Sequence, residues 1–150
     1  MKIAIGNDHV GVDLKNHLVK WLEAQGHEVV NFGTDETTST HYPIYGERVA
    51  RAVVSGECDR GVVICGTGIG ISIAANKVRG VRCALCSEPV SAALARQHND
   101  ANLVALGARM IGPVMAEEIV RTFLSEGFDG GRHALRVGMI MKLGEGESVQ

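Results

Sequence analysis

The chain has 150 residues, a length that suits one domain with a real hydrophobic core, and we expect a single domain spanning residues 1–150. It is 45% hydrophobic and 21% charged, which is typical of folded globular proteins and argues against global disorder. Lys and Arg total 15 against 17 Asp and Glu, so the formal net charge of -2 provides no basic surface for nucleic acid or an anionic membrane. The apolar runs are also far shorter than the ~20 residues of a membrane span.

Glycine supplies 19 of the 150 residues, nearly twice the usual share of about 7%. Such a content without repeats indicates tight turns or places where the backbone approaches a ligand closely. Met1 leads directly into a strand-like segment with no secretion signal, so we expect a cytoplasmic protein. In that compartment the four cysteines are not expected to form a disulfide scaffold.

Short strand-like runs alternate with helical patterns along the chain. In chain order we expect a strand at 3–5, a helix at 12–24, a strand at 27–30, a helix at 45–54, a strand at 61–65, a helix at 70–77, a strand at 81–86, a helix at 90–98, a strand at 103–106 and a helix at 113–124. A last helix and a tail follow from about residue 130. The run 61–65 lacks polar alternation, as in a strand buried on both faces, and 81–86 is expected to be another buried strand. The pattern predicts an α/β fold: a doubly wound, Rossmann-like sheet of five parallel strands with helices on both faces.

In such a sheet, ligands bind beyond the carboxyl ends of the strands, where the strand order reverses. This rule selects the residues that follow Ile5, Cys65, Cys86 and Leu106, and it places Asp8 and His9 at a ligand position. His98 and Asn99 end the predicted fourth helix, and we expect that helix end near the same edge. Alternatively, His98 simply interacts with the helix dipole.

The segment Cys65-Gly-Thr-Gly-Ile-Gly70 follows the most apolar strand and leads into a helix. Its glycines allow backbone N–H groups to surround an anion at a helix N-terminus. The G-x-G-x-G spacing matches neither the dinucleotide-binding pattern nor the phosphate loop of NTPases. The alternative interpretation is an ordinary glycine-rich turn of a nucleotide-fold protein.

Cys65 is the candidate for chemistry among the four cysteines, because N–H groups beside a helix N-terminus stabilise a thiolate. A buried, inert cysteine is the competing interpretation. Cys83 and Cys86 lie three residues apart on a predicted strand, so they point to opposite faces and are interpreted as core residues. We assign no role to Cys58.

Arg132 and Arg136 lie four residues apart near the start of the last predicted helix, hence on one helical face. Like charges at this spacing repel, so a dianionic partner between them would explain the pair. A solvated pair of arginines is the alternative. No group of His, Cys, Asp or Glu has the spacing of zinc ligands, so no metal site is predicted.

Several strings together resemble a family of sugar-phosphate isomerases that includes ribose-5-phosphate, galactose-6-phosphate and allose-6-phosphate isomerases. The resemblance runs from Lys2 to about Val137 and rests on Asp8-His9, His41-Tyr42-Pro43, Gly56-Glu-Cys-Asp59, the string from Cys65 to Asn76, Arg96-Gln-His-Asn-Asp100 and Gly130-Gly-Arg-His133. The sequence departs from the family at His41, where Asp often precedes Tyr-Pro.

The resemblance implies a role for each matching residue. Cys65 would be the base that moves a proton between carbons, Thr67 would relay protons between oxygens, and His98 with Asp8 would open the sugar ring. The backbone of Gly66, Thr67, Gly68, Ile69 and Gly70 would stabilise an enediolate. The implied phosphate contacts are His9, Arg109, Arg132 and Arg136, with Asn99 and Tyr42 also in the substrate pocket.

The family also implies a homodimer or a dimer of dimers, with each active site shared between two chains, and no cofactor. The expected reaction is interconversion of ribose 5-phosphate and ribulose 5-phosphate through a cis-enediolate. Three alternatives stay open: an isomerase of a hexose 6-phosphate (allose or galactose), a structural subunit of a heteromeric isomerase, and a nucleotide-binding module. The last would require an adenine or nicotinamide pocket.

Overall fold

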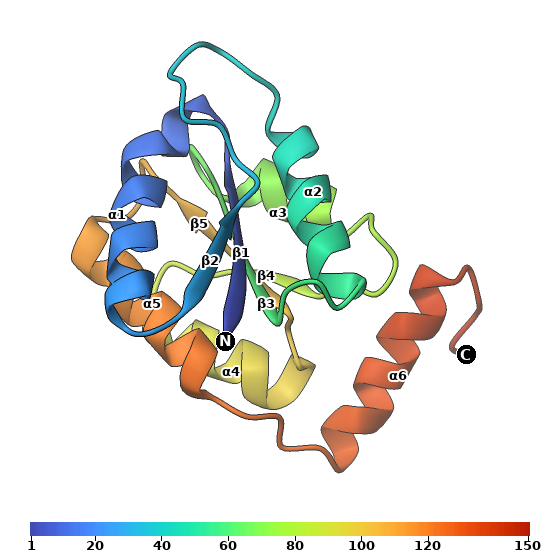
Figure 1. Cartoon of the computed structure of the whole chain (residues 1–150). Coiled ribbons are helices and arrows are strands. Elements are labelled where there is room, and N and C mark those ends of the chain that lie inside the picture. Colours follow the sequence, from blue (N-terminus) through green and yellow to red (C-terminus); the bar gives the residue numbers. More distant parts are fainter.

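The computed structural model describes residues 1–150 and contains one sheet of five strands. These are β1 (Lys2–Asn7), β2 (Glu28–Asn31), β3 (Arg60–Cys65), β4 (Cys83–Leu85) and β5 (Leu103–Gly107). All neighbouring strands are parallel, in the order β2-β1-β3-β5-β4 (Figure 1). The order reverses at β1 and β3, where doubly wound sheets bind their ligands. The predicted five-stranded parallel fold is therefore confirmed.

Helices cover both faces of the sheet. One face carries α1 (Val12–Ala24), which follows a short 3₁₀ turn (His9–Gly11), together with α4 (Pro89–Asn99) and α5 (Pro113–Ser125). The other face carries α2 (Tyr42–Val54) and α3 (Ile69–Ala75). Helix α1 buries Leu14, Leu18 and Leu22, spaced four residues apart on one side, as an amphipathic helix requires. This spacing fixes the side of α1 that packs on the sheet.

The central strand β3 contributes to both cores, as its unbroken apolar run predicts. Val62 and Ile64 pack on the α1 and α5 side, whereas Val63 and Cys65 pack on the α2 and α3 side. Cys86 belongs to the first core, and Cys83 packs against the second. The predicted opposite orientation of these two cysteines is confirmed.

Strand β4 is shorter and more exposed than the sequence predicts. It covers only Cys83–Leu85 instead of 81–86, because the preceding Val81 N–H closes a turn on the Val78 carbonyl at 3.1 Å. The prediction of a strand buried on both faces is wrong, since β4 is an edge strand paired with β5 alone, and Leu85 is 42% exposed. An apolar edge strand leaves unpaired backbone groups open to another chain.

Helix α6 (Arg132–Gly144) lies at the periphery and contains no buried residue (Figure 1). Its first turn meets the end of α4, and Arg82 donates to the Met141 sulfur at 3.3 Å. Four large apolar side chains on α6 remain exposed: Leu135, Met139, Ile140 and Leu143. No helix in the chain is long and apolar enough to cross a bilayer.

The connection from β2 to α2 is held over the carboxyl edge of the sheet by a buried lysine. Lys15 is 1% exposed and pairs with Asp35 in this connection, and Asn7 donates to the Thr34 carbonyl at 3.0 Å. The hydrogen bond from Lys15 holds the pKa of Asp35 below its ordinary value of 3.8. This pair therefore anchors the segment that leads to Tyr42.

Replacement of Asp35 by alanine should lower the free energy of unfolding by about 1–3 kcal/mol, because it leaves the buried Lys15 ammonium without its carboxylate. Lys15→Met removes the charge and fills a similar volume, so it should cost less. The Asp35 contribution is present above pH 3.8 and is lost as the pH falls through the lowered pKa of the folded state. Urea unfolding of both variants from pH 3 to 7 measures this, and equal losses at every pH would contradict it.

Candidate active site

The carboxyl ends of β1, β3 and β5 lie side by side. In the parallel register Asn7 pairs with Ile64, and Cys65 pairs with Gly107. The loops after β3 and β5 are joined by backbone bonds: the N–H of Ala108 donates to the Cys65 carbonyl at 2.9 Å, and that of Arg109 donates to the Gly66 carbonyl at 2.9 Å. The segments after these strands are therefore held together at the edge that the sequence selected.

The glycine-rich loop wraps around the sulfur of Cys65. The N–H of Gly68 donates to Cys65 Sγ at 3.2 Å, and Cys65 is 4% exposed. Gly68 has a φ of 77°, and a Cβ there would lie 2.5 Å from Leu85 Cδ1 and 2.9 Å from the backbone carbon of Leu106. Only glycine fits this position, and the resulting N–H donor stabilises negative charge on the sulfur.

Thr67 lies in this loop and Tyr42 lies beside it, and both residues are exposed. The Thr67 hydroxyl oxygen accepts the Ile69 N–H at 3.3 Å, so its own hydrogen stays free to donate. A Cβ on Gly70 would lie 2.5 Å from the Tyr42 ring, so this glycine lets the ring rest against the first turn of α3. Both hydroxyl side chains are thus exposed next to the loop that contains Cys65.

Asp8 and His9 occupy the end of β1. The Asp8 carboxylate is 5% exposed and accepts the Val10 N–H at 2.9 Å, which caps the 3₁₀ turn. His9 Nδ1 accepts the Thr40 N–H at 3.2 Å, so we assign the ring proton of neutral His9 to Nε2. His9 can therefore donate from Nε2 to an anion at this edge.

The other three cysteines differ from Cys65 in their surroundings. Burial raises the pKa of Cys58 and of Cys83, and burial with the nearby Glu88 raises the pKa of Cys86 to about 11. These three groups are protonated thiols at neutral pH. Cys65 alone accepts a backbone N–H and borders the glycine-rich loop.

His98, Asn99, Arg132 and Arg136 lie at the opposite edge of the sheet, which corrects the expected position of His98. Helix α4 begins after the carboxyl end of β4 and ends before β5, so its last residues come to the amino edge. The five steps along β3 span roughly 16 Å at about 3.3 Å per residue. His98 therefore does not meet Cys65 within one chain, and α6 starts beside it with Arg132 and Arg136 one turn apart.

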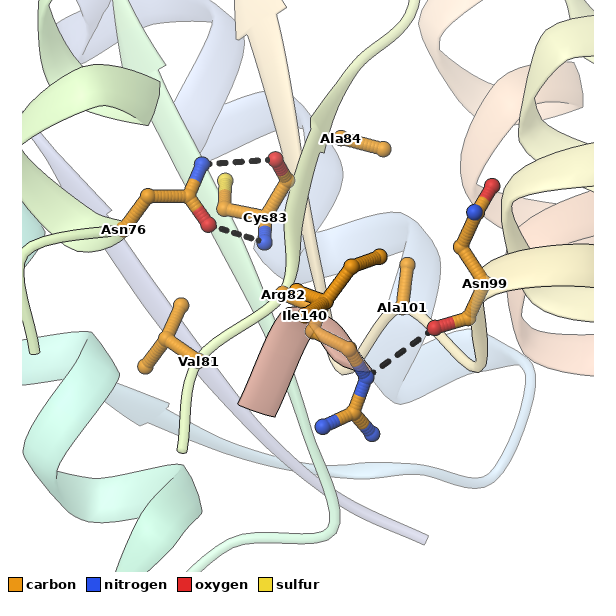
Figure 2. A pocket seen from close by; sticks show the side chains of 8 residues that line it. All are labelled: Asn76, Val81, Arg82, Cys83, Ala84, Asn99, Ala101 and Ile140. Atoms are coloured by element: carbon orange, nitrogen blue, oxygen red, sulfur yellow. Dashed lines mark hydrogen bonds between the residues drawn. The ribbon is translucent and has the colours of Figure 1, made fainter. Parts of the chain in front are cut away.

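A pocket of about 260 Å³ opens at this amino edge between β4 and α6 (Figure 2). It is lined by Asn76, Val81, Arg82, Cys83, Ala84, Asn99, Ala101 and Ile140. Of the predicted site residues only Asn99 contributes, and its carbonyl accepts the Arg82 Nε–H at 3.0 Å. The pocket lies away from Cys65, so its volume does not locate the chemistry.

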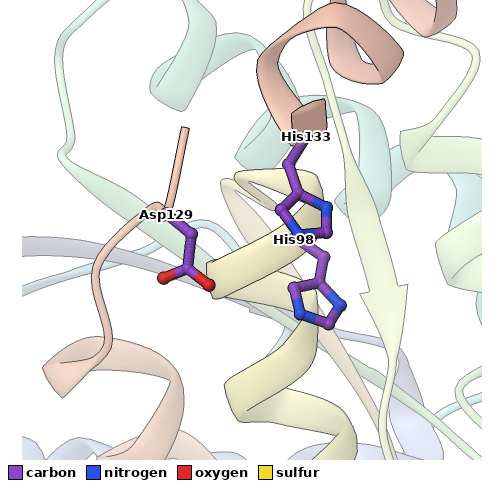
Figure 3. Close-up of side chains that lie close together, drawn as sticks. All are labelled: His98, Asp129 and His133. Carbon is purple, nitrogen blue, oxygen red and sulfur yellow. The ribbon is translucent and has the colours of Figure 1, made fainter. Parts of the chain in front are cut away.

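Sequence reasoning missed one cluster of potential metal ligands. His98, Asp129 and His133 offer ligand atoms that all lie within 4.8 Å of one another (Figure 3). No sequence pattern joins His98 to the other two residues, because α4 meets the start of α6 only through tertiary packing. This cluster is the group of side chains best able to hold a metal ion in the chain.

Comparison with known proteins gives consistent matches over nearly the whole chain. The family described as Ribose/Galactose Isomerase matches residues 3–140. Ribose-5-phosphate isomerase B of Escherichia coli is 52% identical over 139 residues, covering 93% of each chain. The solved structure of Clostridium thermocellum ribose-5-phosphate isomerase B has a TM-score of 0.96 at 53% identity, covering 99% of this chain and 100% of the other. The galactose-6-phosphate isomerase subunit LacB of Clostridium acetobutylicum is 44% identical, covering 83% of this chain and 72% of its own length.

Gly68→Ala should reduce sugar-phosphate isomerisation by about 10²–10³-fold in kcat, the usual cost of losing one preorganised donor. The added Cβ would displace the loop and its N–H donor to Cys65. Gly56→Ala is the matched control, since Gly56 has a similar φ of 81° but no atom within 4 Å of its Cβ position. That control should lose about 1–2 kcal/mol of stability and keep its activity. Equal activity of the two variants in a turnover assay would contradict the role of the loop.

Proposed function

Because the chain belongs to the ribose/galactose isomerase family, we propose that it interconverts ribose 5-phosphate and ribulose 5-phosphate, with Cys65 as the base. The observation that carries this proposal is the sulfur of Cys65 under the Gly68 N–H at the reversal point of the sheet. An aldose–ketose isomerase needs one group that takes a proton from carbon and fixed donors for the charge that forms on oxygen. The Cys65 loop offers both.

The isomerisation step begins with the open-chain aldose. The Cys65 thiolate takes the proton from C2, the C2–H electrons form the C1–C2 double bond, and the former carbonyl electrons move to O1. Backbone N–H groups of the loop stabilise the resulting enediolate. Thr67 donates its hydroxyl proton to O1 and takes the proton of O2, and Cys65 returns its proton to C1. All electrons stay in the sugar, so no redox partner takes part.

Ring opening and part of the phosphate binding require residues from the other edge of the sheet. His98, with Asp8 across the site, would move the proton that opens the sugar ring, and Arg132 with Arg136 would bind the phosphate together with His9 and Arg109. Since the two edges are roughly 16 Å apart in one chain, these groups can meet only if a second copy supplies the amino edge. The proposed site is therefore shared between two chains, with Asn99 and Tyr42 as further substrate contacts.

A twofold arrangement about the β4 edge would supply this geometry. A twofold axis perpendicular to the strands turns those of the second copy antiparallel to those of the first, so each carboxyl edge comes beside the partner's amino edge. The surface along this edge is suited to contact, because β4 itself exposes Leu85 and the neighbouring helices α3 and α4 expose further apolar side chains: Ile69, Ile73, Val90 and Leu94. The exposed apolar residues of α6 extend this surface.

Three alternatives remain: isomerisation of another sugar phosphate, a structural-subunit role and nucleotide binding. The relatives include the LacB subunit and a D-erythrulose-4-phosphate isomerase of Pectobacterium atrosepticum that is 43% identical over 141 residues. The length of the sugar is therefore open to test on erythrulose, ribose, allose and galactose phosphates. A structural-subunit role is disfavoured because Cys65, Thr67 and His98 are all present. A nucleotide-binding role would appear as thermal stabilisation by NAD or ATP but not by sugar phosphates.

We further propose that the whole chain acts as one domain in the cytoplasm, where its four free cysteines would stay reduced.

Cys65→Ala should fold normally and lose about 10²–10⁴-fold or more in kcat for ribose 5-phosphate, the range for loss of a general base. Cys58→Ala is the matched control, because Cys58 is 3% exposed and Cys65 is 4% exposed, so both changes remove a buried thiol. The control should keep its turnover. A Cys65→Ala protein with full activity would assign the base to another residue.

Mixing two inactive variants tests whether the sites are shared. If Cys65→Ala and His98→Ala subunits are unfolded together and refolded, half of the dimers are mixed, and each mixed dimer has one intact site. Activity should therefore return to about a quarter of the wild-type value. Activity that stays at the level of the separate variants would contradict a site built from two chains.

A further inference from the structure

The His98 cluster at the amino edge combines three side chains from two separate parts of the chain. His98 lies near the end of α4, Asp129 lies in the connection from α5, and His133 is the second residue of α6. The two imidazole rings stack with centroids 4.2 Å apart and an angle of 4° between their planes (Figure 3). The Asp129 N–H donates to the Gln97 carbonyl at 3.0 Å, which holds the backbone of Asp129 beside the end of α4.

The nitrogen and oxygen atoms of these three side chains that could bind a metal have no partner, in contrast to those of His9 and His17. None of them forms a hydrogen bond or an ion pair through its side chain, whereas His17 pairs with Glu117 at 2.6 Å and His9 accepts the Thr40 N–H. The ring nitrogens of His98 and His133 and the carboxylate of Asp129 are therefore open to a further ligand.

We propose that His98, Asp129 and His133 form a binding site for a divalent transition-metal ion, with Zn²⁺ as the typical occupant. Two imidazole nitrogens and one carboxylate oxygen are three of the four ligands that zinc takes in open sites. Bond lengths of about 2.0–2.1 Å place tetrahedral ligand atoms roughly 3.3 Å apart. The three side chains must therefore close by up to about 1.5 Å, and the half-buried rings must tilt out of their stack. None of the three residues belongs to either core, so this movement leaves both cores intact.

Two nearby arginines affect the metal affinity of this site and the ligand in its fourth coordination position. Arg132 and Arg136 start the same helix as His133, and their positive charge weakens the affinity for a bare dication. They also favour an anion, such as chloride or phosphate, in the fourth coordination position. The expected site is therefore one of moderate affinity that is filled at micromolar metal rather than a permanent structural centre.

A bound ion should inhibit the enzyme rather than activate it. The ion would occupy the lone pair of His98 that ring opening requires, so turnover of the cyclic substrate would stop. This consequence rests on the proposed function, whereas the binding of the metal rests on the cluster alone. An experiment can therefore contradict the inhibition without contradicting the metal binding, and the reverse.

Cobalt(II) is the probe for the binding test, because thiolate ligation adds an intense near-ultraviolet band that nitrogen and oxygen ligands lack. Wild-type protein should bind Co²⁺ with visible bands and without the thiolate band. Asp129→Asn should weaken binding by at least about tenfold, since loss of even an outer-shell partner of a metal typically costs that much. Cys65→Ala removes a thiol and Glu117→Gln removes a carboxylate that pairs with His17, both outside the cluster, so these two variants should keep the wild-type affinity.

Several outcomes would overturn the site. A thiolate band that disappears in Cys65→Ala would move the metal to the cysteine, and equal affinity of wild type and Asp129→Asn would exclude the cluster. Zn²⁺ inhibition is measured in parallel, and Asp129→Asn should keep its metal-free turnover while resisting the ion. If Co²⁺ binds as expected but Zn²⁺ leaves turnover intact, the metal site stands and the assignment of His98 to ring opening fails.

Discussion

The parallel direction of all five strands is the constraint on which the remaining structure depends. It brings the carboxyl ends of β1, β3 and β5 together, so that Asp8, Cys65 and Arg109 gather at one edge although they are far apart in the sequence. The same constraint sends the end of every connecting helix to the other edge. His98, at the end of α4, is thereby separated from Cys65, and a second chain becomes a condition of the proposed chemistry.

Close backbone approach is the second requirement of the site. At Gly68 the left-handed φ and the nearness of Leu106 together exclude any side chain, and this brings the N–H group to the sulfur of Cys65. The three other cysteines sit in the core, where burial keeps them as thiols. This loop therefore distinguishes Cys65, the proposed base, from three cysteines that are interpreted as packing residues.

The sequence was sufficient for features set by local pattern. The apolar run of β3, the amphipathic spacing of α1 and the glycines after Cys65 predicted the sheet, its helices and the ligand edge. Features that depend on tertiary position could not be predicted in this way. The apolar character of Leu85 was interpreted as core burial although β4 is an edge strand. The position of His98, in contrast, already follows from a helix that connects two parallel strands, so the expectation of His98 at the carboxyl edge was wrong on grounds that the sequence itself offered. The cluster with Asp129 was missed because α4 meets the start of α6 only through tertiary packing.

The central claim is that the Cys65 loop of one chain and the amino edge of another enclose the substrate. A crystal structure with an open-chain four-carbon phosphohydroxamate, whose planar end resembles an enediolate, tests it most directly. We predict the hydroxamate oxygens on the N–H groups of the glycine-rich loop, Cys65 Sγ about 3–3.5 Å from the planar unit, and the phosphate against Arg132 and Arg136 of a second copy. An analogue bound by residues of one chain alone, or one that lies away from the sulfur, would contradict the account.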